Sequence, residues 1–178
     1  MQKLLLHVCC SPCFANYLNF IKEYSVTLYY YNPNIHPQEE YLKRLDNLKI
    51  LASKNNFKLI EAEYELEQWY SFISGLEQEP ENAKRCLKCF ELRLKKSAEY
   101  AQKNGYSHFS TTLNLNLFKD LNYINSLGKK LAEEYNLTYL SFPMTKEQRL
   151  ILKKEADKVV KELNLYKQKY CGCMFSKR

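Results

Sequence analysis

Short apolar runs alternate with segments of helical periodicity along the whole sequence, and this alternation limits the folds that the chain can adopt. The apolar runs that predict strands cover residues 3–8, 26–31, 57–62, 108–113 and 138–142. The segments that predict helices cover residues 11–24, 39–55, 66–73, 86–103, 121–135 and 146–163. Strands that alternate with helices form repeated βαβ units. We therefore expect an α/β fold with a mostly parallel sheet of about five strands and helices on both faces.

The length of 178 residues suits one domain, and the sequence contains no internal repeat or Pro/Gly-rich linker. Residues 1–178 are expected to form a single Rossmann-like or HUP-like domain that ends in an irregular tail, residues 166–178. The first apolar run is too short for a signal peptide, and no run has the length of a membrane span. We expect a cytoplasmic protein with no membrane partner.

The chain is basic and rich in aromatic residues. It carries a formal net charge of +7, with 15 Tyr and 9 Phe. Cations attract phosphates and aromatic rings stack on bases, so a nucleic-acid partner is compatible with this composition. The alternative is that the tyrosines belong to the core and the charge only aids solubility.

Polar and reactive residues follow three of the predicted strands. Cys9 and Cys10 come after the first strand, Asn32 to Asn34 after the second, and Thr111 and Thr112 end the fourth. In open parallel sheets the working site lies beyond the carboxyl ends of the strands, near the point where the strand order reverses. These residues are therefore expected to converge on one edge of the sheet.

All seven cysteines fall into three groups: Cys9, Cys10 and Cys13; Cys86 and Cys89; and Cys171 and Cys173. In a reducing compartment such groups indicate metal binding or redox chemistry rather than a disulfide scaffold. Cys86 and Cys89 share one face at the start of a helix, where thiolates are favoured. With Cys9 and Cys10 they supply four thiolates, which fits a tetrahedral zinc site and a 4Fe-4S cluster equally well.

Cys171 and Cys173 flank a single glycine. A disulfide across one residue is strained and easily reduced, which suits electron transfer, and Gly172 would relax the backbone. The alternative is that both thiols complete a metal site. For Cys13 three roles remain open: a ligand to a second metal, a transient disulfide partner, or packing against the first helix.

Five blocks of the sequence resemble the QueH family of epoxyqueuosine reductases and occur in the same order over nearly the whole chain. They read HVCCSPC at 7–13, YNPNIHP at 31–37, RCLKCFELRL at 85–94, STTL at 110–113 and LYKQKYCGC at 165–173. The resemblance implies an oxidoreductase that acts in tRNA queuosine biosynthesis without cobalamin. It would reduce the epoxide of epoxyqueuosine to an alkene at the wobble position in the anticodon loop, with electrons from an unidentified donor.

The resemblance also implies roles for the cysteines. Cys9, Cys10, Cys86 and Cys89 would hold a 4Fe-4S cluster. Cys171 and Cys173 would act as a redox pair and Cys13 would bind a second iron, so these three are the candidate catalytic residues. Two segments depart from the family pattern, residues 114–119 and 141–146, and both are expected to face the substrate.

Side chains near the expected site are candidates for substrate binding. They are Asn32, Asn34, His36, Thr111, Thr112, Lys119 and Tyr170. Each has a structural alternative: the asparagines would cap turns beside prolines, for example, and Lys119 would be a surface charge.

Other polar residues are expected to have structural roles. Glu40, Arg44 and Asp46 should form the exposed face of their helix, while His7 and Trp69 should belong to the framework and core.

The main competing function is a zinc-stabilised RNA-binding module without redox activity. The colour of an iron–sulfur cluster would distinguish the two.

Overall fold

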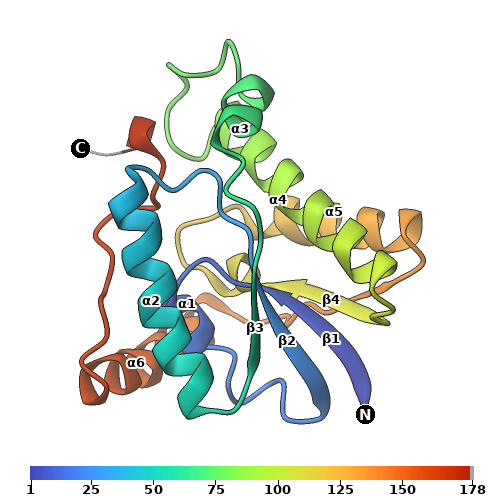
Figure 1. The fold of residues 1–178 in the computed structure, drawn as a ribbon, viewed down its shortest axis with the longest axis vertical. Coiled ribbons are helices and arrows are strands. Elements are labelled where there is room, and N and C mark those ends of the chain that lie inside the picture. Colours follow the sequence, from blue (N-terminus) through green and yellow to red (C-terminus); the bar gives the residue numbers. More distant parts are fainter. Residues whose placement is uncertain (177–178) are drawn as a thin grey trace.

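The computed structural model describes residues 1–176 and contains one five-stranded sheet (Figure 1). Its strands are β1 (Gln2–His7), β2 (Tyr24–Tyr30), β3 (Lys58–Glu61), β4 (His108–Thr111) and β5 (Thr138–Tyr139). They pair in the order β3-β2-β1-β4-β5, and every pair is parallel. The predicted parallel α/β sheet is confirmed.

Helices cover both faces of the sheet, as expected (Figure 1). One face carries α1 (Ser11–Ala15), α2 (Gln38–Lys54) and α6 (Lys146–Glu162), and the other carries α3 (Leu66–Phe72), α4 (Lys84–Lys103) and α5 (Leu121–Glu134). Two short 3-10 helices, η1 (Thr112–Leu115) and η2 (Met174–Ser176), complete the regular structure. The tail therefore has one helical turn at its described end, and Lys177 and Arg178 lie outside the described residues.

Successive residues of the central strand feed two separate cores. Leu4 and Leu6 pack under α1, α2 and α6, whereas Leu5 packs under α4 and α5. All three side chains are fully buried. A parallel strand covered on both faces is apolar at every position, which explains why this strand reads as a continuous apolar run.

Three elements end two or more residues before the sequence predicts. The helix expected over 11–24 ends at Ala15, because the buried Tyr17 hydroxyl donates to the Thr111 carbonyl at 2.6 Å and draws the chain towards β4. The fourth strand ends at Thr111, whose side chain caps η1. The fifth ends at Tyr139, because side chains of β4 and η1 bind the next carbonyl, that of Leu140.

The strand order reverses between β1 and β4, so a crevice is expected where these two strands end.

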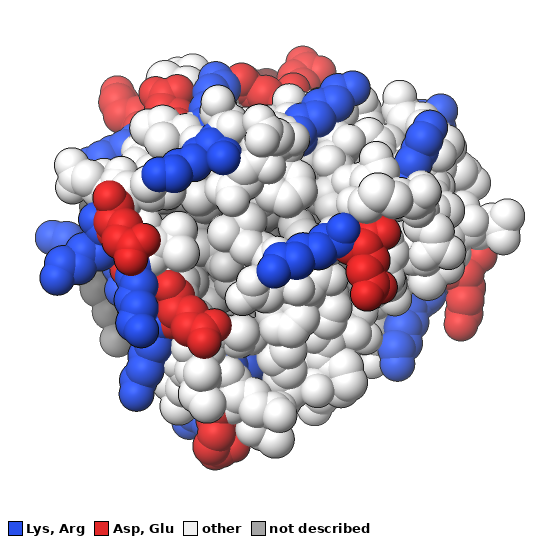
Figure 2. Space-filling view, turned by 90° about the horizontal axis from the view of Figure 1, so that it is seen from below, with Lys and Arg blue, Asp and Glu red and all other residues white. Residues whose placement is uncertain are grey.

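Figure 2 shows the opposite end of the molecule, where the N-terminus lies. Lys and Arg side chains are interspersed there with Asp and Glu around a broad uncharged area. Within residues 1–176, no helix combines the length and apolar character needed to cross a membrane.

Candidate metal centre

Side chains from three strand ends meet at one edge of the sheet, as the sequence predicts. The His7 ring lies 2.8 Å from the Thr111 hydroxyl and 3.1 Å from the Tyr31 carbonyl. Asn32 donates to the Val8 carbonyl at 2.9 Å. Burial and the nearby Arg93 charge lower the pKa of His7 to about 3, so the ring is neutral and structural, as expected.

All three cysteine groups meet at this edge. A cavity of about 570 Å³, including the part open to solvent, contains six of the seven cysteines in its wall: Cys9, Cys13, Cys86, Cys89, Cys171 and Cys173. The remaining thiol, Cys10, lies 3.6 Å from Cys9. Residues far apart in the chain thus form a single thiol-lined site.

The tightest thiol group is Cys9, Cys10 and Cys13, whose sulfur atoms all lie within 4.8 Å of one another. Three sulfurs at this spacing can hold a metal ion. Sequence spacing left the role of Cys13 open, and the structure places it beside Cys9 and Cys10 on the first turn of α1. Cys86 and Cys89 reach the same cavity from the first two turns of α4.

Four cations also line the cavity: Arg44, Arg85, Arg93 and Lys119. Arg44 pairs with Glu40 at 2.7 Å and Lys119 with Glu81 at 2.8 Å. Arg85 and Arg93 are buried and have no carboxylate within ion-pair distance among residues 1–176. Because a buried cation needs a compensating anion, these arginines favour thiolates and an anionic metal–thiolate group in the cavity.

The prediction that Glu40 and Arg44 are exposed is wrong. Their side chains are only 12% and 2% exposed, because the start of α2 packs beneath the C-terminal tail. Asp46 is exposed, as expected. Helical periodicity does not distinguish a solvent face from a face covered by a distant tail.

The thiols differ in their readiness to ionise. Hydrogen bonds from Cys10 and Cys13, aided by the charge of Arg93, hold the pKa of Cys9 well below its usual range. Burial raises the pKa of Cys10, and the hydrogen bonds to Cys10 and Cys9 raise that of Cys13. Cys9 is therefore the member of this group that loses its proton most readily.

The C-terminal pair shows the same asymmetry. A hydrogen bond from Cys173 and the charge of Lys119 lower the pKa of Cys171 to about 5, while the same hydrogen bond and burial raise the pKa of Cys173. Both thiols are free, as are the other five, so the structure does not support a disulfide between them.

Polar atoms without partners point to a ligand in the cavity. Among residues 1–176, several cavity residues keep a buried polar atom without a hydrogen bond: Asn34 Oδ1, Arg85 Nε, Arg93 Nε and Gln168 Oε1. Amide groups also donate to sulfur, from Gln168 Nε2 to Cys10 at 2.9 Å and from the Asn82 N–H to Cys86 at 3.2 Å. Such N–H donors stabilise metal-bound thiolates, so the donor set fits a metal centre.

The predicted substrate contacts separate into two sets. Asn34, Thr112 and Lys119 lie at the site, with the Thr112 hydroxyl 3.7 Å from the Cys9 sulfur. The Lys119 side chain is only 8% exposed, so it is not a surface charge. Asn32 and Thr111 are buried in the framework of the edge, which favours their structural alternatives.

His36 and Tyr170 contact each other through the His36 carbonyl, to which the Tyr170 hydroxyl donates at 2.6 Å.

The sequence analysis missed three residues that line the cavity: Arg85, Arg93 and Gln168. It identified Trp69 as a core residue, and the structure confirms its burial while also placing it in the cavity wall. A buried arginine in an amphipathic helix has the same sequence pattern as an exposed one, so no signal marked Arg85 or Arg93.

Comparison with solved structures confirms the fold. A protein described as a predicted subunit of a tRNA methyltransferase from Methanocaldococcus jannaschii superposes with a TM-score of 0.59 at 14% identity, covering 90% of this chain and 88% of that one. The U34-tRNA thiolase NcsA from Methanococcus maripaludis, determined with its 4Fe-4S cluster, gives 0.58 at 13% identity, covering 99% of this chain and 62% of that one. At these identities the likeness shows a shared Rossmann-like, HUP-like fold.

Comparison of sequences shows the family. The family model for epoxyqueuosine reductase QueH matches residues 4–178. The proteins of that name from Haemophilus influenzae and Thermotoga maritima are 40% and 32% identical to this chain, each over 99% of it and over 72% and 91% of their own lengths. The chain therefore belongs to the epoxyqueuosine reductase QueH family and, with it, to the oxidoreductases of tRNA modification.

Proposed function

We propose that this chain reduces the epoxide of epoxyqueuosine in tRNA to the alkene of queuosine, at an iron–sulfur centre and without cobalamin. The observation that carries the proposal is the convergence of three distant cysteine groups on one cation-lined cavity where the strand order reverses. Family membership supports the reaction, and the donor set supports the metal.

The ligand set is the one that the resemblance to the family implies. Cys9, Cys10, Cys86 and Cys89 would hold a 4Fe-4S cluster, and Cys13, grouped with the first two, would bind a second iron. When bound, the iron centre supplies single electrons and a Lewis acid for the epoxide oxygen. Arg85 and Arg93, both buried, would offset its negative charge.

Cys171 and Cys173 would complete the electron balance. Loss of the epoxide oxygen as water requires two electrons and two protons. Oxidation of the Cys171 thiolate and the Cys173 thiol to a disulfide releases two electrons and one proton, and solvent supplies the second proton. An external dithiol or iron–sulfur donor then restores the two thiols.

The substrate would enter the cavity beside Lys119. Lys119 and Asn34 Oδ1, which has no hydrogen-bond partner among residues 1–176, would bind the modified base, and His36 and Thr112 would contact its edge. An anticodon loop offers unstacked bases that side chains can bind in this way.

The test is conversion of epoxyqueuosine in tRNA by protein that has been reconstituted anaerobically with iron and sulfide, with dithionite and no cobalamin. Nucleosides released from the tRNA are analysed by mass spectrometry for loss of one oxygen atom. We expect queuosine from the reconstituted protein and none from zinc-loaded protein or the Cys86→Ser variant. Equal conversion by zinc-loaded protein would exclude the iron–sulfur mechanism.

A further inference from the structure

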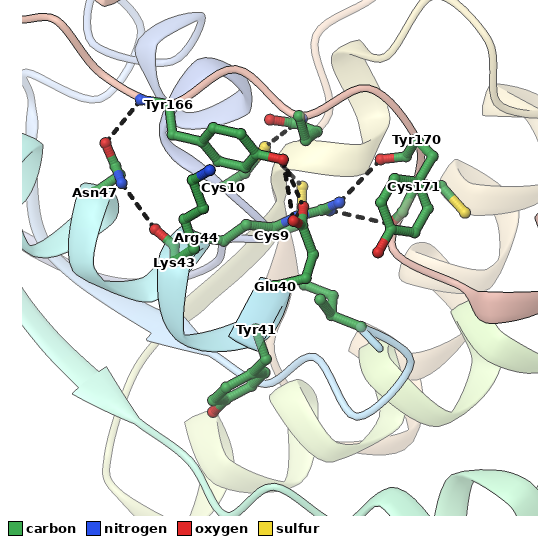
Figure 3. A network of polar contacts seen from close by, with 12 residues as sticks. Cys9, Cys10, Glu40, Tyr41, Lys43, Arg44, Asn47, Tyr166, Tyr170 and Cys171 are labelled. Atoms are coloured by element: carbon green, nitrogen blue, oxygen red, sulfur yellow. Dashed lines mark hydrogen bonds and ion pairs between the residues drawn. The ribbon is translucent and has the colours of Figure 1, made fainter. Parts of the chain in front are cut away.

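Arg44 is a buried cation on α2 whose guanidinium is directed at the C-terminal tail (Figure 3). Its Nη1 donates to the Cys171 carbonyl at 3.2 Å and its Nη2 to the Tyr170 carbonyl at 3.0 Å. A planar guanidinium can bind two neighbouring carbonyls at once, whereas a lysine has a single nitrogen to offer. The contact therefore depends on the shape of the arginine as well as its charge.

Glu40 fixes this guanidinium in place and reaches the tail itself. It accepts from Arg44 Nε at 2.7 Å and from the Tyr166 hydroxyl at 3.0 Å. Figure 3 shows Glu40 and Arg44 as one connected network between α2 and the tail. Because both side chains are largely buried, removal of either one leaves an uncompensated charge.

The loop before α2 holds the same stretch of tail from another side. The His36 N–H donates to the Gly172 carbonyl at 2.8 Å. Gly172 has a φ of 101°, and a Cβ at this position would lie 2.8 Å from Ile35 Cγ1 and 3.1 Å from Arg44 Nη1. Only glycine allows the tail to approach so closely.

These contacts matter because residues 163–173 contain no helix or strand. Side-chain and loop contacts, rather than a sheet or helix, fix the positions of Cys171 and Cys173 in the cavity wall. We propose that Arg44 is a positioning residue that holds the Cys171-Gly172-Cys173 segment at the cavity in the geometry required for electron transfer. This inference rests on the proposed function only in the use it assigns to the two thiols.

Hydrogen exchange of the reconstituted protein tests the docking directly. For Arg44→Met we expect amide exchange across residues 166–173 to accelerate about tenfold or more, with β1 and α4 unchanged. Arg44→Lys keeps the charge but cannot donate to both carbonyls at once, so it should behave like Arg44→Met. Gly172→Ala disturbs the same contact from the tail and should give the same acceleration with Arg44 intact.

Turnover separates positioning from a general structural role. A displaced reacting group costs rate rather than substrate affinity, so Arg44→Met should lower kcat about a hundredfold while KM for the tRNA stays nearly constant. Lys49→Met is the matched control, because it removes an exposed cation from the same helix that contacts Asp46 and Glu61 but not the tail. It should match the parent protein in both measurements.

Three results would overturn the inference: unchanged tail exchange in both Arg44→Met and Gly172→Ala, parent-like behaviour of Arg44→Lys, or a loss that appears in KM alone. A parent protein without reductase activity, combined with a freed tail in Arg44→Met, would refute the proposed function and leave the docking role of Arg44 intact.

Discussion

Cys171 and Lys119 illustrate how individual residues prepare this site. Lys119 is largely buried and its ammonium stabilises the Cys171 thiolate, while Glu81 holds the lysine at 2.8 Å. The hydrogen bond from Cys173 acts in the same direction. Cys171 is therefore ionised at neutral pH in the metal-free protein, and the thiolate is the reactive form of cysteine.

Alkylation of the metal-free protein tests this ionisation. We expect iodoacetamide to modify Cys171 well before Cys173 at pH 7, because the pKa of Cys171 is lowered to about 5 and that of Cys173 is raised. The rate at Cys171 should fall as the pH drops through about 5, where the thiolate gains a proton. Peptide mass spectrometry of samples quenched at successive times gives both rates.

Lys119→Met should move the Cys171 rate profile to higher pH, since the nearby positive charge is lost. Lys129→Met, which removes an exposed lysine from α5, is the control and should leave it in place. Preferential modification of Cys173 would contradict the assignment.

At the residue scale, the sequence identifies the reactive groups better than their surroundings. The spacing of the seven cysteines predicts a shared site, and all three groups meet in one cavity. The roles of Arg44 and Arg85 were not predictable, because each is buried by chain segments distant in sequence, among them the tail at residues 170–176. Burial by remote segments leaves no local pattern.

Gly128 and Tyr139 show how closely the elements pack around β4. The Tyr139 ring of β5 lies against Gly128 of α5, where a Cβ would be 2.4 Å from a ring carbon. The ring is held by hydrogen bonds from its hydroxyl to Asn125 at 3.2 Å and from Asn114 at 3.2 Å. It cannot move aside without loss of these bonds.

Gly128→Ala should therefore lower the free energy of unfolding by about 1–3 kcal/mol, although alanine is the better helix former. Urea denaturation followed by circular dichroism measures the difference. Ser126→Ala, at an exposed position of the same helix, should leave the stability nearly unchanged. A Gly128→Ala variant as stable as the parent would show that the ring shifts at no cost.

The existence and order of the elements were predictable from periodicity, whereas some of their ends were not. The helix that begins at Ser11 stops after five residues because of a tertiary hydrogen bond from Tyr17. The strand that begins at Thr138 stops after two residues because side chains bind the carbonyl of Leu140. Both ends depend on contacts between distant segments.

At the scale of the whole molecule, the proposed centre joins parts of the chain that are far apart in the sequence. Its cysteines come from the turn after β1, from α1, from the start of α4 and from the tail. A ligand that binds only the folded state stabilises it in proportion to its affinity and free concentration. Metal binding should thus stabilise the fold as well as supply the chemistry.

Removal of the metal by an iron chelator under reducing conditions should lower Tm. A gain of about 2.7 kcal/mol, expected at a free metal concentration of about 100 times Kd, corresponds to a change of about 5–10 °C for a chain of this size. Thermal denaturation of the reconstituted and chelated forms checks this. A Cys86→Ser, Cys89→Ser double variant should respond less to the chelator, and an equal response would place the metal elsewhere.

The central claim is that the cysteine cavity holds a reducible iron–sulfur centre. The most direct measurement is the content of iron, acid-labile sulfide and zinc in anaerobically purified protein, with visible and EPR spectra before and after dithionite. We predict about four irons and four sulfides per chain, further iron at Cys13, and a visible absorption that dithionite bleaches. About one zinc per chain, with no sulfide and no colour after reconstitution, would contradict the claim.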